Sequence, residues 1–197
     1  MKSAAQTEAF IGLGSNLGDG KKILQEAWQA LGRIKGIQPE RLSSPYMTAP
    51  LGMESEHWFT NAVGRLWVTL PARELLQALM AVEAGFGRLR KGKGYQDRSL
   101  DLDLLYYGEM VMDSPELILP HPRIGERLFV LIPFAELEPD HIDPITGETI
   151  TVMEQRLRNA IAAGESEEQE IARGGRWDDY QAADRSGPDS PCDRGRK

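Results

Sequence analysis

The sequence predicts an α+β fold, a ferredoxin-like sandwich with a largely antiparallel sheet and additional helices. Two segments with apolar residues at helical spacing alternate with four segments whose residues are typical of strands. The resulting order is strand, helix, strand, strand, helix, strand. In a ferredoxin-like sandwich this order places helices over one face of an antiparallel sheet.

The first half of the pattern contains two strands and a helix. Residues Glu8 to Gly14 form an apolar run closed by glycine, and Asp19 is a favourable helix N-cap. Residues Ile37 to Tyr46 predict the second strand, and Met47 to Trp58 predict a loop. The helix between these strands is indicated by apolar residues at helical spacing: Ile23, Leu24, Ala27, Trp28, Leu31 and Ile34.

The second half repeats this alternation. Residues Thr60 to Thr69 alternate and contain β-favouring side chains, and Leu100 to Tyr107 predict the last strand of the pattern. Between them, Pro71 suits the first turn of a helix and Gly85 its end. A further helix near residues Val152 to Ala163 would add another layer.

The chain of 197 residues predicts one domain over residues 8–163, followed by a polar, mobile tail over residues 164–197. The only cysteine is Cys192, which excludes an internal disulfide and a cysteine-based zinc site. A net charge of −7 argues against nucleic acid as the main partner. The sequence has no apolar stretch of the roughly 18 residues that a membrane span needs, and no secretory apolar run follows Met1. We therefore expect a cytoplasmic protein that binds neither membranes nor nucleic acid.

Two acidic residues lie within an apolar strand. Because strand side chains alternate, Asp101 and Asp103 project from one face while the leucines between and beside them face the other. Neighbouring carboxylates repel each other, whereas Mg²⁺ prefers one or two carboxylates together with waters and nucleotide phosphates. The pair predicts a metal site; taken alone, a solvated edge strand is the commoner meaning of such a pattern.

A basic, glycine-rich segment leads directly into this acidic strand. It contains four glycines between Gly85 and Gly94 and the bases Arg88, Arg90, Lys91, Lys93 and Arg98. A solvated connection is the alternative interpretation. Beside paired acids, however, the combination suits polyphosphate, because phosphoryl transfer needs positioned groups and neutralised charge. The glycines would let this segment close as a lid.

Other phosphate-binding motifs are absent from the sequence. It has no G-x-x-x-x-G-K-[ST], and Gly12, Gly14 and Gly18 do not have the dinucleotide-binding spacing. His121 lies between two prolines, where a rigid backbone would aim its imidazole at phosphate, although an ordinary loop histidine is the alternative. The three histidines are too scattered for a zinc site.

Several blocks of the chain resemble the hydroxymethyldihydropterin pyrophosphokinase family over roughly residues 8 to 160. The order and spacing of these blocks match the family. They are Gly12-Leu13-Gly14-Ser15-Asn16-Leu17-Gly18, Thr48-Ala49-Pro50-Leu51-Gly52, Phe59-Thr60-Asn61-Ala62, Gly87-Arg88, Arg98-Ser99-Leu100-Asp101-Leu102-Asp103 and Leu119-Pro120-His121-Pro122-Arg123.

The resemblance implies transfer of pyrophosphate from ATP to 6-hydroxymethyl-7,8-dihydropterin in folate biosynthesis. It implies that Asp101 and Asp103 bind two Mg²⁺ ions and act in catalysis with Arg88 and Arg98. The residues implied to contact ATP are Glu83, Arg88, Arg90, Arg98, His121 and Arg127.

The resemblance also implies a pterin site. Its residues are Thr48, Leu51, Phe59, Asn61, Tyr95 and Phe129. Two aromatic rings suit a flat heterocycle, and an asparagine offers both a donor and an acceptor. The family often has Trp-Gly-Pro where this chain has Tyr95-Gln96-Asp97, and a proline where it has Ala49. Tyr95 still offers a ring, whereas Asp97 places a negative charge beside Arg98.

Two other functions also fit parts of the pattern. A magnesium-dependent nucleotidyltransferase or other phosphotransferase would use paired acids in the same way, but it would not need the aromatic pair. A regulatory module that senses small molecules is common on this fold. Such a module would have no reason to place two aspartates beside five basic residues. We expect a monomeric enzyme of small-molecule substrates.

Overall fold

The structure, a computed structural model, describes residues 5–51, 57–87 and 99–177. Its centre is a six-stranded sheet in which every pair of neighbouring strands is antiparallel. The strand order is β5-β1-β4-β3-β8, and β2 also pairs with β4. The strands are β1 (Thr7–Ser15), β2 (Ile37–Leu42), β3 (Tyr46–Thr48), β4 (Phe59–Val68), β5 (Asp101–Tyr107) and β8 (Ile171–Arg173).

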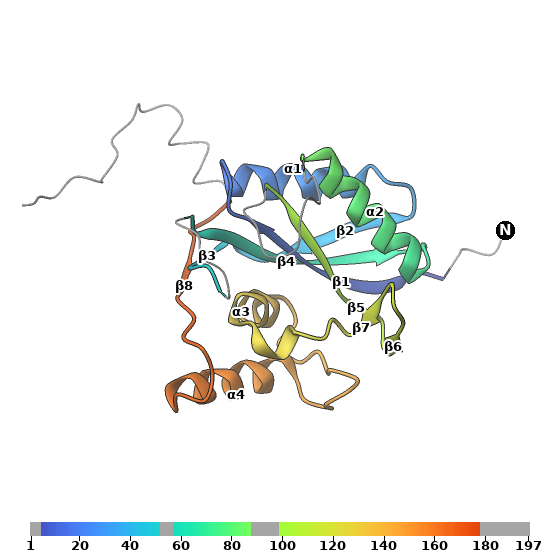
Figure 1. The fold of residues 1–197 in the computed structure, drawn as a ribbon. Helices are drawn as coiled ribbons and strands as arrows, with labels where there is room; N and C mark the ends of the chain where they lie inside the picture. The colour runs from blue at the N-terminus through green and yellow to red at the C-terminus, as the bar shows by residue number, and fades with distance from the viewer. Residues whose placement is uncertain (1–4, 52–56, 88–98, 178–197) are drawn as a thin grey trace, which may run out of the picture.

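Helices cover both faces of this sheet. Helices α1 (Gly20–Gly32) and α2 (Ala72–Gly85) lie on one face, and α3 (Leu128–Leu137) lies on the other with α4 (Ile150–Ala162) outside it (Figure 1). Strands β6 (Met112–Asp113) and β7 (Ile118–Leu119) form a small separate hairpin, and the 3-10 helix η1 (Ile124–Glu126) precedes α3. The predicted α+β class, the largely antiparallel sheet and the additional helical layer are confirmed.

The side chains of β1 alternate between the two faces of the sheet, and each face has its own hydrophobic core. Ala9, Ile11 and Leu13 pack under α1 and α2, whereas Phe10 belongs to the core under α3 and α4. On the first face, Gly64 of β4 makes room for Trp28 of α1, because a Cβ at Gly64 would lie only 2.3 Å from the Trp28 ring. Asp19 caps α1 as predicted, accepting a hydrogen bond from Lys22 N at 3.1 Å.

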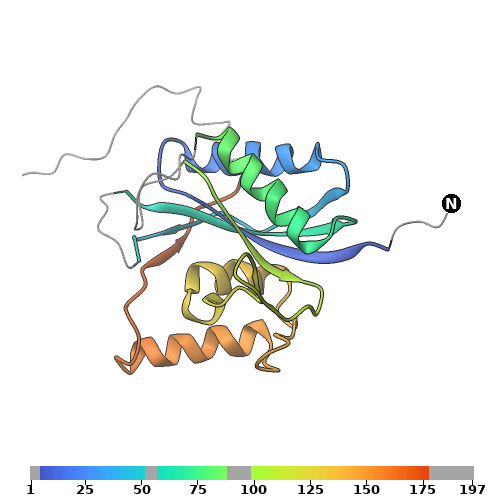
Figure 2. The ribbon, with the colours of Figure 1, turned by 45° about the vertical axis from the view of Figure 1, so that its right-hand side comes forward.

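Helix α3 was not predicted by the sequence pattern. Its ten residues are almost all apolar, six of them are buried, and Pro133 lies inside the helix. Because α3 packs between the sheet and α4, it is apolar on every side and has no amphipathic period (Figure 2). No helix in the described part of the chain is both long and apolar enough to cross a membrane.

The predicted second strand is two strands. The break falls at Ser43, Ser44 and Pro45, where Ser43 Oγ accepts a hydrogen bond from Val63 N at 3.0 Å. The amide of Ser44 instead donates to Glu136 Oε1 of α3 at 3.0 Å, and Pro45 has no amide hydrogen. Strand pairing resumes at Tyr46.

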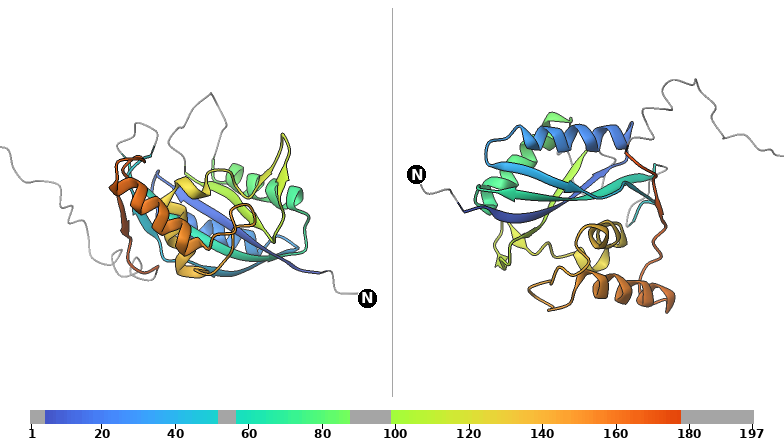
Figure 3. Two further views of the ribbon diagram at one scale, coloured as in Figure 1. Left: turned by 90° about the horizontal axis from the view of Figure 1, so that it is seen from below. Right: turned by 180° about the vertical axis from the view of Figure 1, so that it is seen from behind.

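The chain beyond α4 corrects the prediction of a mobile tail that begins at Gly164. Residues 171–173 form β8, which pairs with β3 and extends the sheet (Figure 3). The strand has only three residues, Ile171–Arg173, and is held by its partners, so it is too short for apolar periodicity to reveal it. Residues 178–197 lie outside the described residues.

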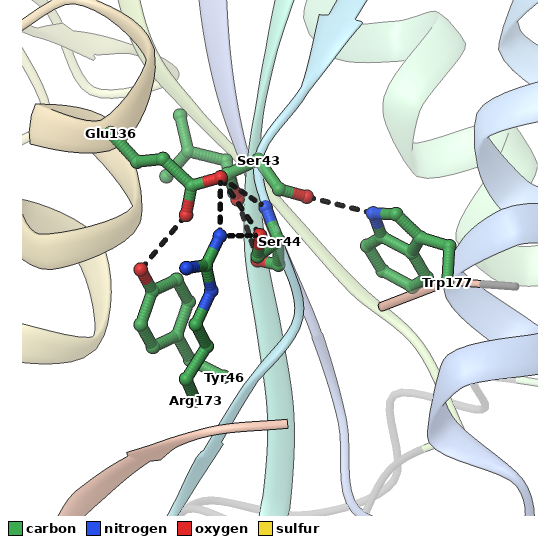
Figure 4. A network of polar contacts seen from close by, with 7 residues as sticks. Ser43, Ser44, Tyr46, Glu136, Arg173 and Trp177 are labelled. Atoms are coloured by element: carbon green, nitrogen blue, oxygen red, sulfur yellow. Dashed lines mark hydrogen bonds and ion pairs between the residues drawn. The ribbon is translucent and has the colours of Figure 1, made fainter. Parts of the chain in front are cut away.

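Polar contacts fasten this segment to the sheet and to α3 (Figure 4). Arg173 donates to Ser44 Oγ at 2.6 Å and lies 3.5 Å from Glu136 Oε1, and the Trp177 indole donates to Ser43 O at 2.8 Å. The Tyr46 hydroxyl donates to Glu136 Oε2 at 2.8 Å. Burial, together with this acceptor, raises the pKa of Tyr46 to about 12, so the hydroxyl keeps its proton at neutral pH.

Candidate active site

A pocket lies between the α3 face of the sheet and the start of α3. The five described residues that were expected to bind a pterin all line it, together with both aspartates. The lining is Gly14, Thr48, Ala49, Leu51, Phe59, Asn61, Asp101, Asp103, Arg123, Arg127 and Phe129. We call this the first pocket.

Gly14 of β1 lies in the floor of the first pocket. On the α3 face, β1 presents Phe10 to the core and then Gly12 and Gly14, which pair with Asp103 and Asp101 of β5. Gly14 also pairs with Asn61 of β4. A Cβ at Gly14 would lie 3.1 Å from Asn61 Oδ1, so any side chain here would press on the asparagine.

Asn61 is held by Thr48 in the wall of the first pocket. Asn61 Nδ2 donates to Thr48 Oγ1 at 2.8 Å, and both residues are buried. This bond fixes the amide so that its oxygen faces Gly14 and the pocket. Phe59 and Phe129 add aromatic surface from β4 and α3. In this arrangement a flat heterocycle can stack against the two phenylalanine rings, and the asparagine can hydrogen-bond one of its polar edges.

Asp101 and Asp103 lie on one face of β5, as the alternation predicted. Leu102 and Leu104 face the opposite core, whereas both aspartates line the first pocket. Arg127 Nη1 lies 3.3 Å from Asp103 Oδ2, and the Arg127 guanidinium also lies 5.5 Å from the Phe129 ring centre. The Asp103 side chain is nevertheless 37% exposed, so its carboxylate remains accessible from the pocket.

A second pocket runs along the outer edge of β5. It is bounded by α2, by residues 114–118 and by His121 and Pro122. Asp103 lines both pockets. A small molecule in each pocket would therefore meet the other beside this carboxylate.

Glu83 and His121 both lie in the second pocket. Glu83 is 3% exposed, and its Oε1 accepts a hydrogen bond from Leu102 N at 2.8 Å. Because Leu102 lies between the two aspartates, this contact fixes the backbone that carries them. Sequence reasoning placed Glu83 near the site but did not anticipate this contact.

His121 is held in one tautomer. Its Nδ1 accepts a hydrogen bond from Arg123 N at 3.2 Å, and its Nε2 lies 3.9 Å from Asp103 Oδ2. Burial lowers the pKa of His121, and the nearby Arg127 and Arg123 act in the same direction, which outweighs the effect of Asp103. A neutral imidazole that accepts at Nδ1 carries its proton on Nε2, directed towards the acidic pair.

Four expected site residues lie outside the described residues: Arg88, Arg90, Tyr95 and Arg98. The other expected residues lie in one or both pockets. Within the described ranges, no group of three or more His, Cys, Asp and Glu side chains could hold a metal ion. Any cation here would therefore need ligands beyond the Asp101 and Asp103 carboxylates.

Arg123 is a lining residue that sequence reasoning did not assign. It lies in the block from Leu119 to Arg123, borders the first pocket, and also lines a hollow between η1 and α4. Its position in a recognisable block was the only available signal, because its approach to the pocket depends on how η1 packs.

The chain has an α+β fold with two adjoining pockets that share Asp103, and each pocket is open to a small molecule. Residues 10–139 match the 7,8-dihydro-6-hydroxymethylpterin-pyrophosphokinase family. The chain belongs to this family, whose members transfer a pyrophosphoryl group to hydroxymethyldihydropterin.

Two bacterial relatives are both called 2-amino-4-hydroxy-6-hydroxymethyldihydropteridine pyrophosphokinase. The protein of Synechocystis sp. is 42% identical over 142 residues, which are 72% of each chain. The protein of Methylorubrum extorquens is 38% identical over 144 residues, which are 73% of this chain and 89% of the relative.

The fold also resembles that of a solved structure, Plasmodium falciparum HPPK-DHPS. The TM-score is 0.65 at 11% identity, over 83% of this chain. The match spans 46% of the Plasmodium chain, so the present chain corresponds to less than half of that protein. At this identity the likeness supports the fold alone.

Proposed function

We propose that this protein transfers the pyrophosphoryl group of ATP to the hydroxymethyl group of 6-hydroxymethyl-7,8-dihydropterin, as a step of folate biosynthesis. The observation that carries the proposal is that Asp103 lines both pockets. The hydroxyl oxygen forms a bond to the β-phosphorus, and the bond from that phosphorus to the α-phosphate oxygen breaks. AMP leaves, the pterin diphosphate remains, and the hydroxyl proton is released.

The pterin occupies the first pocket. Its ring lies against Phe59 and Phe129, Tyr95 stacks at its side, and Leu51 is one of the groups that hydrogen-bond it. Asn61 and Thr48 hydrogen-bond its polar edge. The bond from Asn61 to Thr48 supports this assignment because it leaves the asparagine oxygen directed into the pocket.

ATP occupies the second pocket and extends its phosphates towards Asp103. The neutral His121, with its proton on Nε2, donates to a phosphate oxygen, and Glu83 holds the strand beside it. Arg127 approaches the phosphates from the Asp103 side. Arg88, Arg90 and Arg98 bind the phosphates as forked, permanently charged donors.

The two carboxylates fit Mg²⁺. Asp101 and Asp103 offer hard oxygen ligands on one face, and Mg²⁺ usually takes one or two carboxylates and completes its shell with water and phosphate. Bound there, two such ions would neutralise the phosphate charge that develops during transfer. The protein's part is to hold the hydroxyl and the β-phosphate in line and to exclude water.

We also propose that the protein acts as a monomer in the cytoplasm and that its partners are its two small-molecule substrates. The overall negative charge supports the absence of a nucleic-acid partner.

The nucleotide product tests the proposal. The full chain is incubated with ATP, Mg²⁺ and 6-hydroxymethyl-7,8-dihydropterin, and the products are separated by chromatography. AMP and pterin diphosphate in equal amounts are expected. ADP would indicate transfer of a single phosphoryl group, and the absence of turnover would contradict the proposal.

A further inference from the structure

The segment after α4 touches both walls of the first pocket. Residues 169–173, here called the strap, run from the start of α3 to the free edge of β3. Figure 3 shows this part of the chain climbing from α4 to the sheet. The strap lies beyond residues 10–139, over which the chain matches its family.

The Gln169 side chain forms two hydrogen bonds to the backbone, one on each side of Arg127. Its Oε1 accepts a hydrogen bond from Leu128 N at 2.9 Å, and its Nε2 donates to Glu126 O at 2.9 Å. The first amide groups of a helix have no partner within the helix, and α3 has no capping side chain from its own N-cap, Arg127. Gln169 therefore supplies from a distant part of the chain the cap that α3 lacks.

Residues beside these two hydrogen bonds form part of the first pocket. Arg127 reaches Asp103, and Phe129 follows one residue after Leu128. A shift in the first turn of α3 would therefore move both a charged group and a ring of the pocket.

The rest of the strap holds the opposite wall. Glu170 O accepts a hydrogen bond from Ala49 N at 3.2 Å, and Ile171 pairs with Thr48. Thr48 holds Asn61 in turn, and Ala49 lines the pocket. Consecutive residues of one short segment thus fix the distance between the β3 wall and the α3 wall.

We propose that Gln169 is a positioning residue for the substrate pocket, acting through Glu126 and Leu128 on Arg127 and Phe129. The strap sets the width of the slot that receives the flat ring. This inference rests on the proposed function, because it takes the first pocket as the pterin site. It extends the functional unit beyond the part of the chain that matches the family.

The test compares Gln169→Ala with the unaltered full chain. Pterin affinity is measured by calorimetry with a non-hydrolysable ATP analogue at saturation, and melting temperature is measured in parallel. Loss of the two hydrogen bonds at an incompletely buried site should weaken pterin binding by roughly three- to tenfold. The melting temperature should fall by only a few degrees, as expected for the loss of two hydrogen bonds in a chain of this size.

Two further variants make the test specific. Gln155→Ala removes an exposed glutamine of α4 whose side chain donates to Asn159, and it should bind pterin as the unaltered chain does. Gln169→Glu keeps the oxygen that accepts from Leu128 N, so it should bind pterin more tightly than Gln169→Ala.

Unchanged pterin affinity in Gln169→Ala would overturn the proposal, as would equal weakening in Gln155→Ala. A lower melting temperature with unchanged affinity would show a merely structural role and would also overturn it. Failure of the proposed function is distinguishable, since the unaltered chain would then bind no pterin.

Discussion

Asp103 stands where the two pockets meet, which makes it the residue with the largest expected effect on turnover. Asp103→Asn keeps the size of the side chain but removes its charge. We expect kcat to fall by about 10³-fold, because charge stabilisation in transfer is lost, while melting temperature stays nearly constant. Steady-state kinetics and thermal unfolding check this expectation.

Asp113→Asn is the matched control for this substitution. Asp113 lies exposed on β6, so its variant should turn over at the rate of the unaltered protein. Near-normal kcat in Asp103→Asn would contradict the role assigned to the carboxylate.

The two glycines of β1 allow a sharper comparison. In Gly14→Ala the new methyl group would lie 3.1 Å from Asn61 Oδ1, whereas in Gly12→Ala its nearest neighbour would be Leu105 at an ordinary 3.7 Å. We expect Gly14→Ala to raise the KM for pterin by roughly tenfold, because even an ångström of misplacement in a binding site is costly. Gly12→Ala should change this KM much less. Equal values for the two variants would contradict the description of the pocket floor.

At the scale of elements, the loop between α3 and α4 is organised around one carboxylate. Asp143 accepts hydrogen bonds from the Tyr106 hydroxyl at 2.8 Å and from the amides of Ile145 and Thr146 at 2.9 and 2.7 Å. Burial alone would raise the pKa of Asp143, but these bonds favour the charged form and lower it. The loop therefore holds an ionised aspartate.

This lowered pKa predicts how stability depends on pH. Because the folded pKa lies below the unfolded value of about 3.9, the contribution is complete above that value and is lost as pH falls through the folded pKa. Asp143→Asn should be less stable than the unaltered protein at pH 7, and this difference should shrink towards pH 3. Urea unfolding at several pH values measures it, and a difference independent of pH would contradict the assignment.

The elements that could be predicted from the sequence are those whose apolar residues recur at strand or helix spacing. The alternation in β5 placed Asp101 and Asp103 on one face, and the helical spacing after Asp19 located α1. Helix α3 could not be found in this way, because burial on all sides erases an amphipathic stripe. The contacts of Gln169 depend on packing between segments about forty residues apart, which no local pattern records.

At the scale of the whole molecule, the fold extends further along the chain than Gly164, where the composition indicated that the tail begins. Deletion of residues 164–197 removes β8 and Trp177, which packs against the core under α1 and α2. We expect the melting temperature to fall by several degrees, since roughly 2–4 °C corresponds to each kcal/mol in a chain of this size. Differential scanning calorimetry measures this change.

Deletion of residues 178–197 is the control for that truncation. Residues 178–197 have a polar composition with few apolar side chains to bury. Their deletion should therefore leave melting temperature and activity unchanged. Equal losses in the two truncations would mean that the stabilising contacts lie beyond Trp177.

The edge strands of the sheet are the places where another copy of the chain could pair with it. An open strand edge is a template on which another chain can add a strand. The outer backbone of β5 is occupied by Glu83 and by the His121 amide, and β2 carries Pro39, Glu40 and Arg41. At the remaining border, β8 ends the sheet with three residues, two of them exposed. Without β8, the backbone of Tyr46–Thr48 would become the border strand, and copies of the chain could stack through it. The last short strand thus also covers an edge on which another chain could add a strand.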